Sequence, residues 1–346
     1  MRDSIFYSSI KSLFVSFCAI IGLCLGIFVI AALVGVIGNN SESTKLAPEN
    51  TEEILPNAKG VRKIVSDSAP VILQINIDGV IGMEGLDTKS IKKKLVESRE
   101  GDYKDDRVKA LLLFIDSPGG TVTDSDGIFR AILDYKKMYK TPVYAYIDGL
   151  CASGAMYIAL AADKVYSNDV GIIGSVGVIA PTFVNLTKLL EKVGVDALTI
   201  SAGKGKDAMN PMRPWKPGED KNYQEIIQYY YNDFVTLVTE HRPLITKEKL
   251  INDYGAHIFP AGTAKEYGYI DETGAQISIV LDDLLKKVGI EDDNYQFIKL
   301  ESTQWWKGLF TAQASLLTGK IKHEFSLSPE ADLMMQNKFL YLYYPQ

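Results

Sequence analysis

Residues 111–120 read Leu-Leu-Leu-Phe-Ile-Asp-Ser-Pro-Gly-Gly, and this stretch decides the fold. Five apolar residues in a row are typical of a buried strand, and the two glycines after them permit a turn that other residues avoid. Apolar residues at helical spacing follow from Asp124 to Met138. A strand, a glycine-bearing turn and a helix in this order indicate one unit of an α/β domain.

Similar units recur along the chain. We predict strands over residues 71–77, 108–115, 142–147, 164–166 and 176–179, the first of them continuing into a hairpin at its glycine. We predict helices over residues 124–138, 151–162, 183–193 and 223–241. Alternation of strands and helices predicts an α/β domain built largely from parallel pairing.

Composition excludes several classes of protein. The chain has 346 residues, of which 47% are hydrophobic, so it is long enough to bury a core. Its net charge of -6 argues against a nucleic-acid partner. Cys18 and Cys24 lie in an N-terminal apolar stretch, which leaves Cys151 as the only thiol of the folded part. We therefore expect no disulfide framework, no structural metal and no cofactor.

The N-terminal apolar stretch is the length of a membrane anchor. No charged residue occurs from Leu13 to Gly38, and a helix of that length would span about 39 Å, more than the ~30 Å of a hydrocarbon core. A cleaved signal peptide normally has a shorter apolar region, so we favour a retained anchor. Arg2 and Lys11 precede it and mainly glutamates follow, which predicts a cytoplasmic N-terminus and an extracytoplasmic domain on the cell (inner) membrane.

These features divide the chain into five parts. We expect a cytoplasmic N-terminus over residues 1–12, an anchor over 13–38, a polar linker over 39–68, a folded domain over 69–290 and a C-terminal extension over 291–346. The extension contains an aromatic run at residues 339–344. That run suits a packed arm, an oligomer contact or a membrane-surface element, and we favour the packed arm.

Ser153 follows a second strand and stands near the start of a helix. The simplest interpretation is a helix N-cap, the commonest reason for serine at such a place. The alternative is a nucleophile on a sharp turn, with the Gly154 N–H directed at a developing oxyanion. Two strand ends with glycine-bearing turns would lie side by side, so that Gly120 and Gly154 would offer their N–H groups as an oxyanion hole.

A nucleophilic serine needs a base, and the three histidines lie outside these loops. The loop at residues 201–211 offers Lys204 and Lys206. Enclosure in a site lowers the pKa of a lysine amine, and the free amine could then take the serine proton. Ser175 could orient such an amine, although a turn serine explains that residue equally well.

Four segments together resemble one family. With Asp116–Gly120, Cys151–Gly154, Gly174–Val178 and Gly205–Pro211 in this order, the chain resembles the signal peptide peptidase A family in its short, single-copy form. The likeness covers residues 71–277.

The resemblance implies roles for individual residues. It implies Ser153 as nucleophile, Lys206 rather than Lys204 as general base, Ser175 as the residue that orients the lysine, and Gly120 and Gly154 as oxyanion donors. It also implies a Clp protease/crotonase type of fold, a spiral of strand-strand-helix units. The oligomer would be ring-shaped, and neighbouring subunits would complete each site.

We therefore expect a membrane-anchored serine endopeptidase that degrades cleaved signal peptides by a Ser/Lys dyad. Its partners would be peptides, the lipid bilayer and further copies of the same chain. Two alternatives remain: a non-catalytic membrane scaffold of the same fold, and an enzyme like the acyl-CoA isomerases and hydratases. Labelling of Ser153 by a serine-directed acylating inhibitor separates the peptidase from the second alternative.

Overall fold

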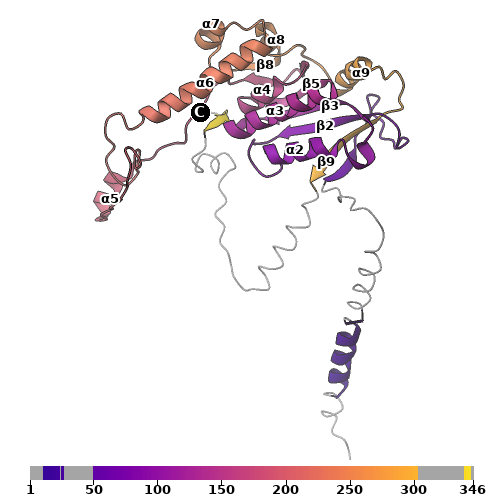
Figure 1. Cartoon of the computed structure of the whole chain (residues 1–346), viewed down its shortest axis with the longest axis horizontal. Coiled ribbons are helices and arrows are strands. Elements are labelled where there is room, and N and C mark those ends of the chain that lie inside the picture. The colour runs from indigo at the N-terminus through magenta and orange to yellow at the C-terminus, as the bar shows by residue number, and fades with distance from the viewer. Residues whose placement is uncertain (1–10, 24, 27–49, 303–338, 344–346) are drawn as a thin grey trace, which may run out of the picture. The chain divides into compact units, whose positions relative to one another are not determined.

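A computed structural model of the protein describes residues 11–23, 25–26, 50–302 and 339–343, which belong to two units, Met1–Ala47 and Pro48–Gln346. Residues 11–23 and 25–26 of the first unit are helical (Figure 1). The rest of the predicted anchor lies outside the described residues. In the described part of the chain, no helix is long and apolar enough to cross a membrane.

The second unit is built around an eight-stranded sheet with the order β1-β9-β2-β3-β5-β7-β8, in which β6 also pairs with β5. Its strands are β1 (Asn50–Ile54), β2 (Val71–Asp78), β3 (Val108–Ser117), β5 (Val143–Ala152), β6 (Lys164–Ser167), β7 (Ile172–Gly174), β8 (Ile258–Pro260) and β9 (Gln296–Ser302). Only the edge strands β1 and β8 pair antiparallel. The predicted α/β class with largely parallel pairing is confirmed.

Helices cover both faces of this sheet (Figure 1). They are α2 (Thr88–Glu97), α3 (Val122–Tyr139), α4 (Gly154–Ala159), α5 (Thr187–Val193), α6 (Lys221–His241), α7 (Lys247–Lys249), α8 (Ala261–Tyr267) and α9 (Ile277–Lys287), with short turns η1 (Gly101–Tyr103) and η2 (Leu250–Tyr254). Leu111 and Leu113 join the core with α2, α3, α4 and α6, whereas Leu112 between them joins the core with α9. The apolar run of β3 is continuous because both of its faces are covered.

The end of β5 differs from the prediction. The strand continues to Ala152 instead of ending at Ile147, and α4 begins at Gly154 instead of Cys151. Ile115 still pairs with Ile147, but the register then shifts and Ser117 pairs with Cys151. This bulge hides the continuation of the strand from sequence analysis, because its polar residues interrupt the apolar pattern.

Two other strand predictions were wrong. Residues 176–179 do not form the expected strand, and Ile179 makes only an isolated bridge. The strand at this place in the sheet is β7, which covers Ile172–Gly174. The hairpin expected after residues 71–77 does not form, because the strand is interior and pairs in parallel with β3 and β9. An apolar run alone does not distinguish a hairpin arm from an interior parallel strand.

The folded unit also extends beyond residues 69–290. Strand β1 lies in the predicted linker and β9 lies in the predicted extension. The two strands pair with each other in antiparallel orientation. A further strand, β10 (Leu340–Leu342), pairs with β4 (Gly119–Thr121). These segments were missed because strand pairing is held by backbone hydrogen bonds, which polar residues form as well as apolar ones.

Strand β3 should carry much of the stability of this unit. The side chain of Leu113 is fully buried, so Leu113→Ala should lower the free energy of unfolding by about 2–5 kcal/mol, from lost burial and the cavity that remains. Urea denaturation followed by circular dichroism measures this loss. Val96→Ala, at a 57% exposed position, is the control and should change the value by less than about 0.5 kcal/mol. Equal effects of both substitutions would contradict this assignment of the core.

Candidate active site

Ser153 stands on a strained turn between β5 and α4. Its φ is 57° and its ψ is −114°, and its side chain makes no capping hydrogen bond to the helix. The residue is 1% exposed, and its Oγ lies 3.5 Å from the Gly177 carbonyl oxygen. A positive φ at a residue with a side chain costs about 1–3 kcal/mol and is typical of functional sites. Ser153 does occupy the N-cap position of α4, but its hydroxyl makes no capping hydrogen bond, so capping does not explain the choice of serine.

Two backbone N–H groups meet beside this serine. A Cβ added at Gly154 would lie 3.2 Å from the Gly120 nitrogen, so the two predicted oxyanion donors are neighbours. Gly119 has a φ of +98°, and its own N–H donates to the Ser117 hydroxyl. A Cβ added at Gly120 would lie only 1.9 Å from the Ile81 carbonyl oxygen. Glycine is therefore required at both positions of this turn. Gly119 is required by its positive φ, and Gly120 is required by its close contact with Ile81.

The backbone around these donors is covered by β10. Tyr341 lies opposite Gly120 in an antiparallel ladder. A Cβ added at Gly119 would lie 2.1 Å from the Tyr341 carbonyl oxygen and 2.7 Å from the Gly154 nitrogen. The Tyr341 carbonyl therefore lies in the same small region as the backbone of Gly119, Gly120 and Gly154. The packed-arm interpretation of the aromatic run is confirmed for Leu340, Tyr341 and Leu342, which are all buried.

Ser175 lies next to Ser153 because two paired strands end together. Gly174 of β7 pairs with Ala152 of β5, and the Ser153 N–H donates to the Gly174 carbonyl at 2.9 Å. Ser175 has a φ of 55° and is 6% exposed. Within the described residues its hydroxyl has no hydrogen-bond partner, although its N–H donates to the His257 carbonyl at 2.7 Å. The site therefore holds a second buried hydroxyl that is available to an incoming donor.

Lys206 does not reach Ser153 within one chain. It is exposed on residues 182–220, here called the arm, which projects away from the sheet (Figure 1). The arm has its own ion cluster, because Arg213 pairs with Asp207 at 2.8 Å and with Glu219 at 2.7 Å. The guanidinium lowers the pKa of the Asp207 carboxyl.

The described histidines supply no base either. His241 bonds through its ring to the Leu237 carbonyl at 3.0 Å, and the ring of His257 lies against Phe259. Neither ring has a hydrogen bond to Ser153. Four of the five predicted site residues come together, and the predicted base stands apart from them.

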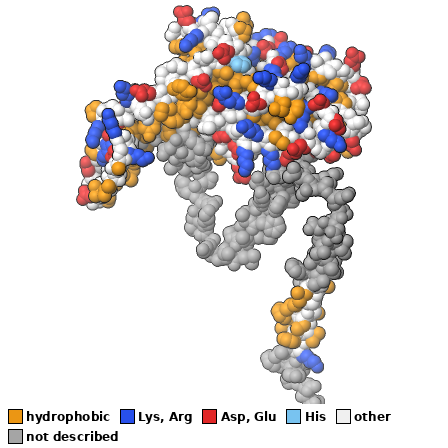
Figure 2. Space-filling model, viewed as in Figure 1, with side chains coloured by type: hydrophobic (Ala, Val, Ile, Leu, Met, Phe, Trp, Pro, Cys, Tyr) orange, Lys and Arg blue, Asp and Glu red, His pale blue; other side chains and the backbone are white. Residues whose placement is uncertain are grey.

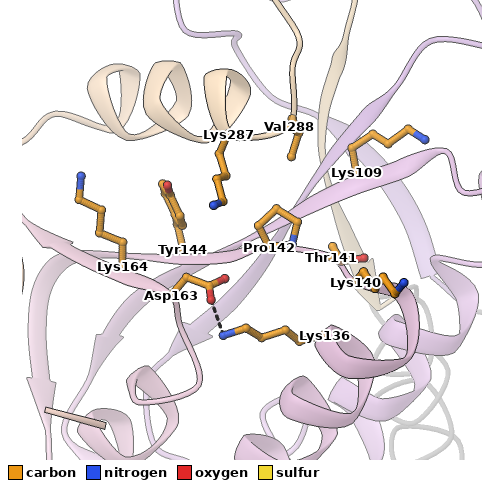
Figure 3. A pocket seen from close by; sticks show the side chains of 10 residues that line it. All are labelled: Lys109, Lys136, Lys140, Thr141, Pro142, Tyr144, Asp163, Lys164, Lys287 and Val288. Carbon is orange, nitrogen blue, oxygen red and sulfur yellow. Dashed lines mark ion pairs between the residues drawn. The ribbon is translucent and has the colours of Figure 1, made fainter. Parts of the chain in front are cut away.

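A lysine-lined pocket lies at the other end of the sheet. It has a volume of about 680 Å³ and is lined by five lysines, Lys109, Lys136, Lys140, Lys164 and Lys287 (Figure 3). Lys136 pairs with Asp163 at 2.6 Å (Figure 3). Strands β3 and β5 begin beside this pocket, whereas Ser153 follows the end of β5. Several of its lysines stand at helix C-termini, where positive charge is favourable, so the pocket has an explanation independent of catalysis.

Cys151 should be chemically inert although it lies two residues before Ser153. Burial raises the pKa of its thiol, and the residue is 0% exposed. Because the thiolate is the reactive form, iodoacetamide should leave Cys151 unmodified in the native protein and modify it after denaturation, as peptide mass mapping would reveal. Ser66→Cys, at an exposed position, is the positive control for native labelling. Native labelling of Cys151 at the rate of that control would contradict the burial of this strand end.

Comparison with known proteins identifies related sequences. Residues 135–291 match the model of peptidase family S49, and residues 99–168 match the model of Clp protease. "Putative signal peptide peptidase SppA" of Enterococcus faecium is 32% identical over 70% of this chain and 69% of its own length. "Serine protease SPPA, chloroplastic" of Arabidopsis thaliana is 31% identical over 53% of this chain and 27% of its own length.

A protein of Methanocaldococcus jannaschii, named as a putative protease, is 38% identical over 54% of this chain, and the match spans 57% of that relative. A mutant ClpP1 from Listeria monocytogenes has a TM-score of 0.40 and 19% identity, covering 60% of this chain and 94% of its own. The Clp protease match agrees with the expected type of α/β fold. The family match and the Enterococcus relative confirm the resemblance carried by the four motifs: the chain belongs to peptidase family S49, the serine peptidases that resemble SppA.

Proposed function

We propose that this chain is a membrane-anchored serine endopeptidase that degrades cleaved signal peptides. Ser153 is the nucleophile, and Lys206 of a neighbouring copy is its general base. The single observation that carries the proposal is the strained backbone of Ser153, whose hydroxyl makes no capping bond and which lies beside the N–H groups of Gly120 and Gly154. Strain of this kind persists only where the surrounding structure enforces it.

The reaction follows from this arrangement. The free amine of Lys206 takes the hydroxyl proton of Ser153 as Oγ bonds to the carbonyl carbon of the peptide. The N–H groups of Gly120 and Gly154 stabilise the resulting oxyanion. As the C–N bond breaks, the leaving amine takes the proton from the Lys206 ammonium. The amine of Lys206 then takes a proton from water as the water oxygen bonds to the acyl carbon. As the ester bond breaks, the Lys206 ammonium returns that proton to Oγ of Ser153.

A base from a second copy is supported by three features. Lys206 is exposed and has no ion pair among the described residues, and the buried hydroxyl of Ser175 has no partner there. The arm also presents exposed apolar residues, of which Leu198 is 87% and Ile200 is 90% exposed. Figure 2 shows hydrophobic side chains at the end of the arm. Apolar surface of this kind is typical of a protein interface.

The choice of substrate is supported by the chemistry of two regions. Side chains around β10 are apolar, with Val80, Met83 and Ile179 in one cluster, and an apolar peptide strand would pack on the same side chains. The uncharged stretch Leu13–Gly38 would hold the domain at the bilayer in which cleaved signal peptides remain. The positive flank before it favours an extracytoplasmic domain.

Ser153→Ala should reduce cleavage of an apolar peptide ester by about 10³-fold or more, because the acyl-enzyme cannot form. Fluorogenic assays in detergent micelles would measure this loss. A serine-directed acylating inhibitor should label the wild type at Ser153 only. Ser66→Ala, at an exposed serine far from the site, is the matched control and should keep full activity. Full activity of the Ser153→Ala variant would overturn the proposed function.

Mixing two inactive variants tests whether the base comes from a second copy. Ser153→Ala keeps the lysine and Lys206→Ala keeps the serine. If the dyad forms between copies, co-assembly of equal amounts should recover about one quarter of wild-type activity. The reason is that an intact Ser153 meets an intact Lys206 of its neighbour at about one quarter of the head-to-tail contacts.

Lys204→Ala is the matched control, since Lys204 lies in the same exposed turn, and it should remain active alone. No recovery, with the variants shown to co-assemble, would mean that the base belongs to the same chain as the serine.

A further inference from the structure

The pocket of five lysines beside the beginning of β3 and β5 carries positive charge that acidic side chains offset only in part. Lys136 pairs with Asp163 at 2.6 Å. Lys164 pairs with Asp283 at 3.0 Å. The other three lysines of the pocket have no ion pair within the described part of the chain, and they are Lys109, Lys140 and Lys287. Three positive charges therefore remain without an acidic partner.

Two helix ends beside this pocket reduce the surplus without removing it. Lys140 is the C-cap of α3, and Lys287 is the last residue of α9. A helix C-terminus carries about half of a negative charge. The two helix ends therefore leave about two positive charges without a counterion. The whole chain has a net charge of -6, so this gathering of cations runs against its composition.

Lys140 occupies a backbone conformation that favours glycine. Its φ is 51° and its ψ is 33°, which is left-handed. Helices α5 and α8 also end in a left-handed residue, and there the chain has Gly194 and Gly268. Glycine is the usual residue at such helix ends because it has no Cβ to clash. Lysine therefore stands at the pocket at a conformational cost that glycine would avoid.

The lysines surround a space that is large enough for a ligand. Its volume of about 680 Å³ lies within the roughly 300–1,000 Å³ that is typical of small-molecule sites. Figure 3 shows Lys287 pointing from α9 toward the sheet, with Lys164 on one side of the pocket and Lys109 and Lys140 on the other. Ammonium groups from a helix on each side of the sheet and from two strands thus stand around one cavity.

The neighbouring backbone indicates which kind of anion fits. Strand β3 pairs with β2 and β5, and the beginning of β5 pairs with β3 and β6. Because both strands are paired on both sides, they offer no free edge to an extended acidic peptide. A lysine ammonium is a compact point charge and a common ligand of phosphate. A ligand with two or more phosphates carries enough negative charge to match the surplus.

We propose that this pocket binds an anion with at least two phosphate groups, either free in solution or as the headgroup of a diphosphate lipid. The site is separate from the candidate active site, since β5 begins beside the pocket and Ser153 follows the end of the same strand. None of its lining residues takes part in the proposed reaction. The inference therefore stands or falls independently of the peptidase activity.

The test measures binding of inorganic triphosphate to the full-length protein in detergent micelles by isothermal titration calorimetry at low ionic strength. The wild type should bind with a dissociation constant below about 1 mM. Affinity should fall as salt is added, because salt screens exposed charges. Micelles that contain cardiolipin should displace triphosphate if a lipid headgroup is the natural ligand. Undisturbed binding of triphosphate in those micelles would identify a free anion instead.

Pocket variants locate the bound anion. The double variant Lys109→Ala/Lys287→Ala should raise the dissociation constant by about tenfold or more, from the loss of two charged donors. Its matched control is Lys247→Ala/Lys249→Ala, which removes the same charge from exposed positions outside the pocket. That control should keep the affinity within about twofold, because distant charges are screened.

Lys140→Gly separates binding from folding at the residue with the left-handed backbone. It should weaken triphosphate binding by several-fold without lowering the thermal unfolding midpoint, because glycine fits this conformation. Lack of saturable binding by the wild type, or equal losses in the pocket and control double variants, would overturn the site. Equal affinity for a polyglutamate peptide of the same charge would overturn its assignment to phosphate.

Discussion

The site depends on one irregularity in the pairing of β3 with β5. The ladder is regular up to Ile115 and Ile147, after which Ser117 pairs with Cys151, so β5 contains residues that β3 does not match. Asp116 stabilises these extra residues, because its carboxylate accepts the Leu150 N–H at 2.8 Å. The bulge moves the end of β5 so that Ser153 emerges beside the glycine turn of the neighbouring strand. Bulges commonly re-aim a side chain in this way next to active sites.

The same close approach brings the edge of a second, smaller sheet to the serine turn. Gly120 of β4 lies close to Gly154 of the serine turn, and β4 pairs with β10. A strand edge with its own N–H and C=O groups binds an extended chain through backbone bonds, whatever the side chains. Strand β10 is such an extended chain, and the Tyr341 ring stacks on the ring of Tyr157. In the proposed function, oxyanion stabilisation and peptide binding would be two uses of one backbone edge.

The proposed base, Lys206, is positioned differently from the two serines. Ser153 and Ser175 are held rigidly by strands β5 and β7, which end side by side. Lys206 instead lies on an arm whose shape depends on its own ion cluster around Arg213. A segment that is ordered by local contacts, yet exposes apolar residues such as Ile200, is suited to packing on a second copy. Such an arrangement would couple assembly to activity, since an isolated copy would have a nucleophile without its proton acceptor.

The sequence by itself determined the α/β class, the strand that ends at the glycine turn, and the position of Ser153 between a strand and a helix. Those features depend on local periodicity and on the backbone freedom of glycine, which neighbouring residues display directly. Only the tertiary structure decided that β5 continues through a bulge, that β1 and β9 close one side of the sheet, and that Tyr341 pairs with Gly120. It also showed that the Ser153 hydroxyl makes no capping bond and that Lys206 stands apart from it within one chain. These outcomes rest on pairings between segments far apart in the chain, whose register depends on backbone hydrogen bonds and packing partners that no local pattern records.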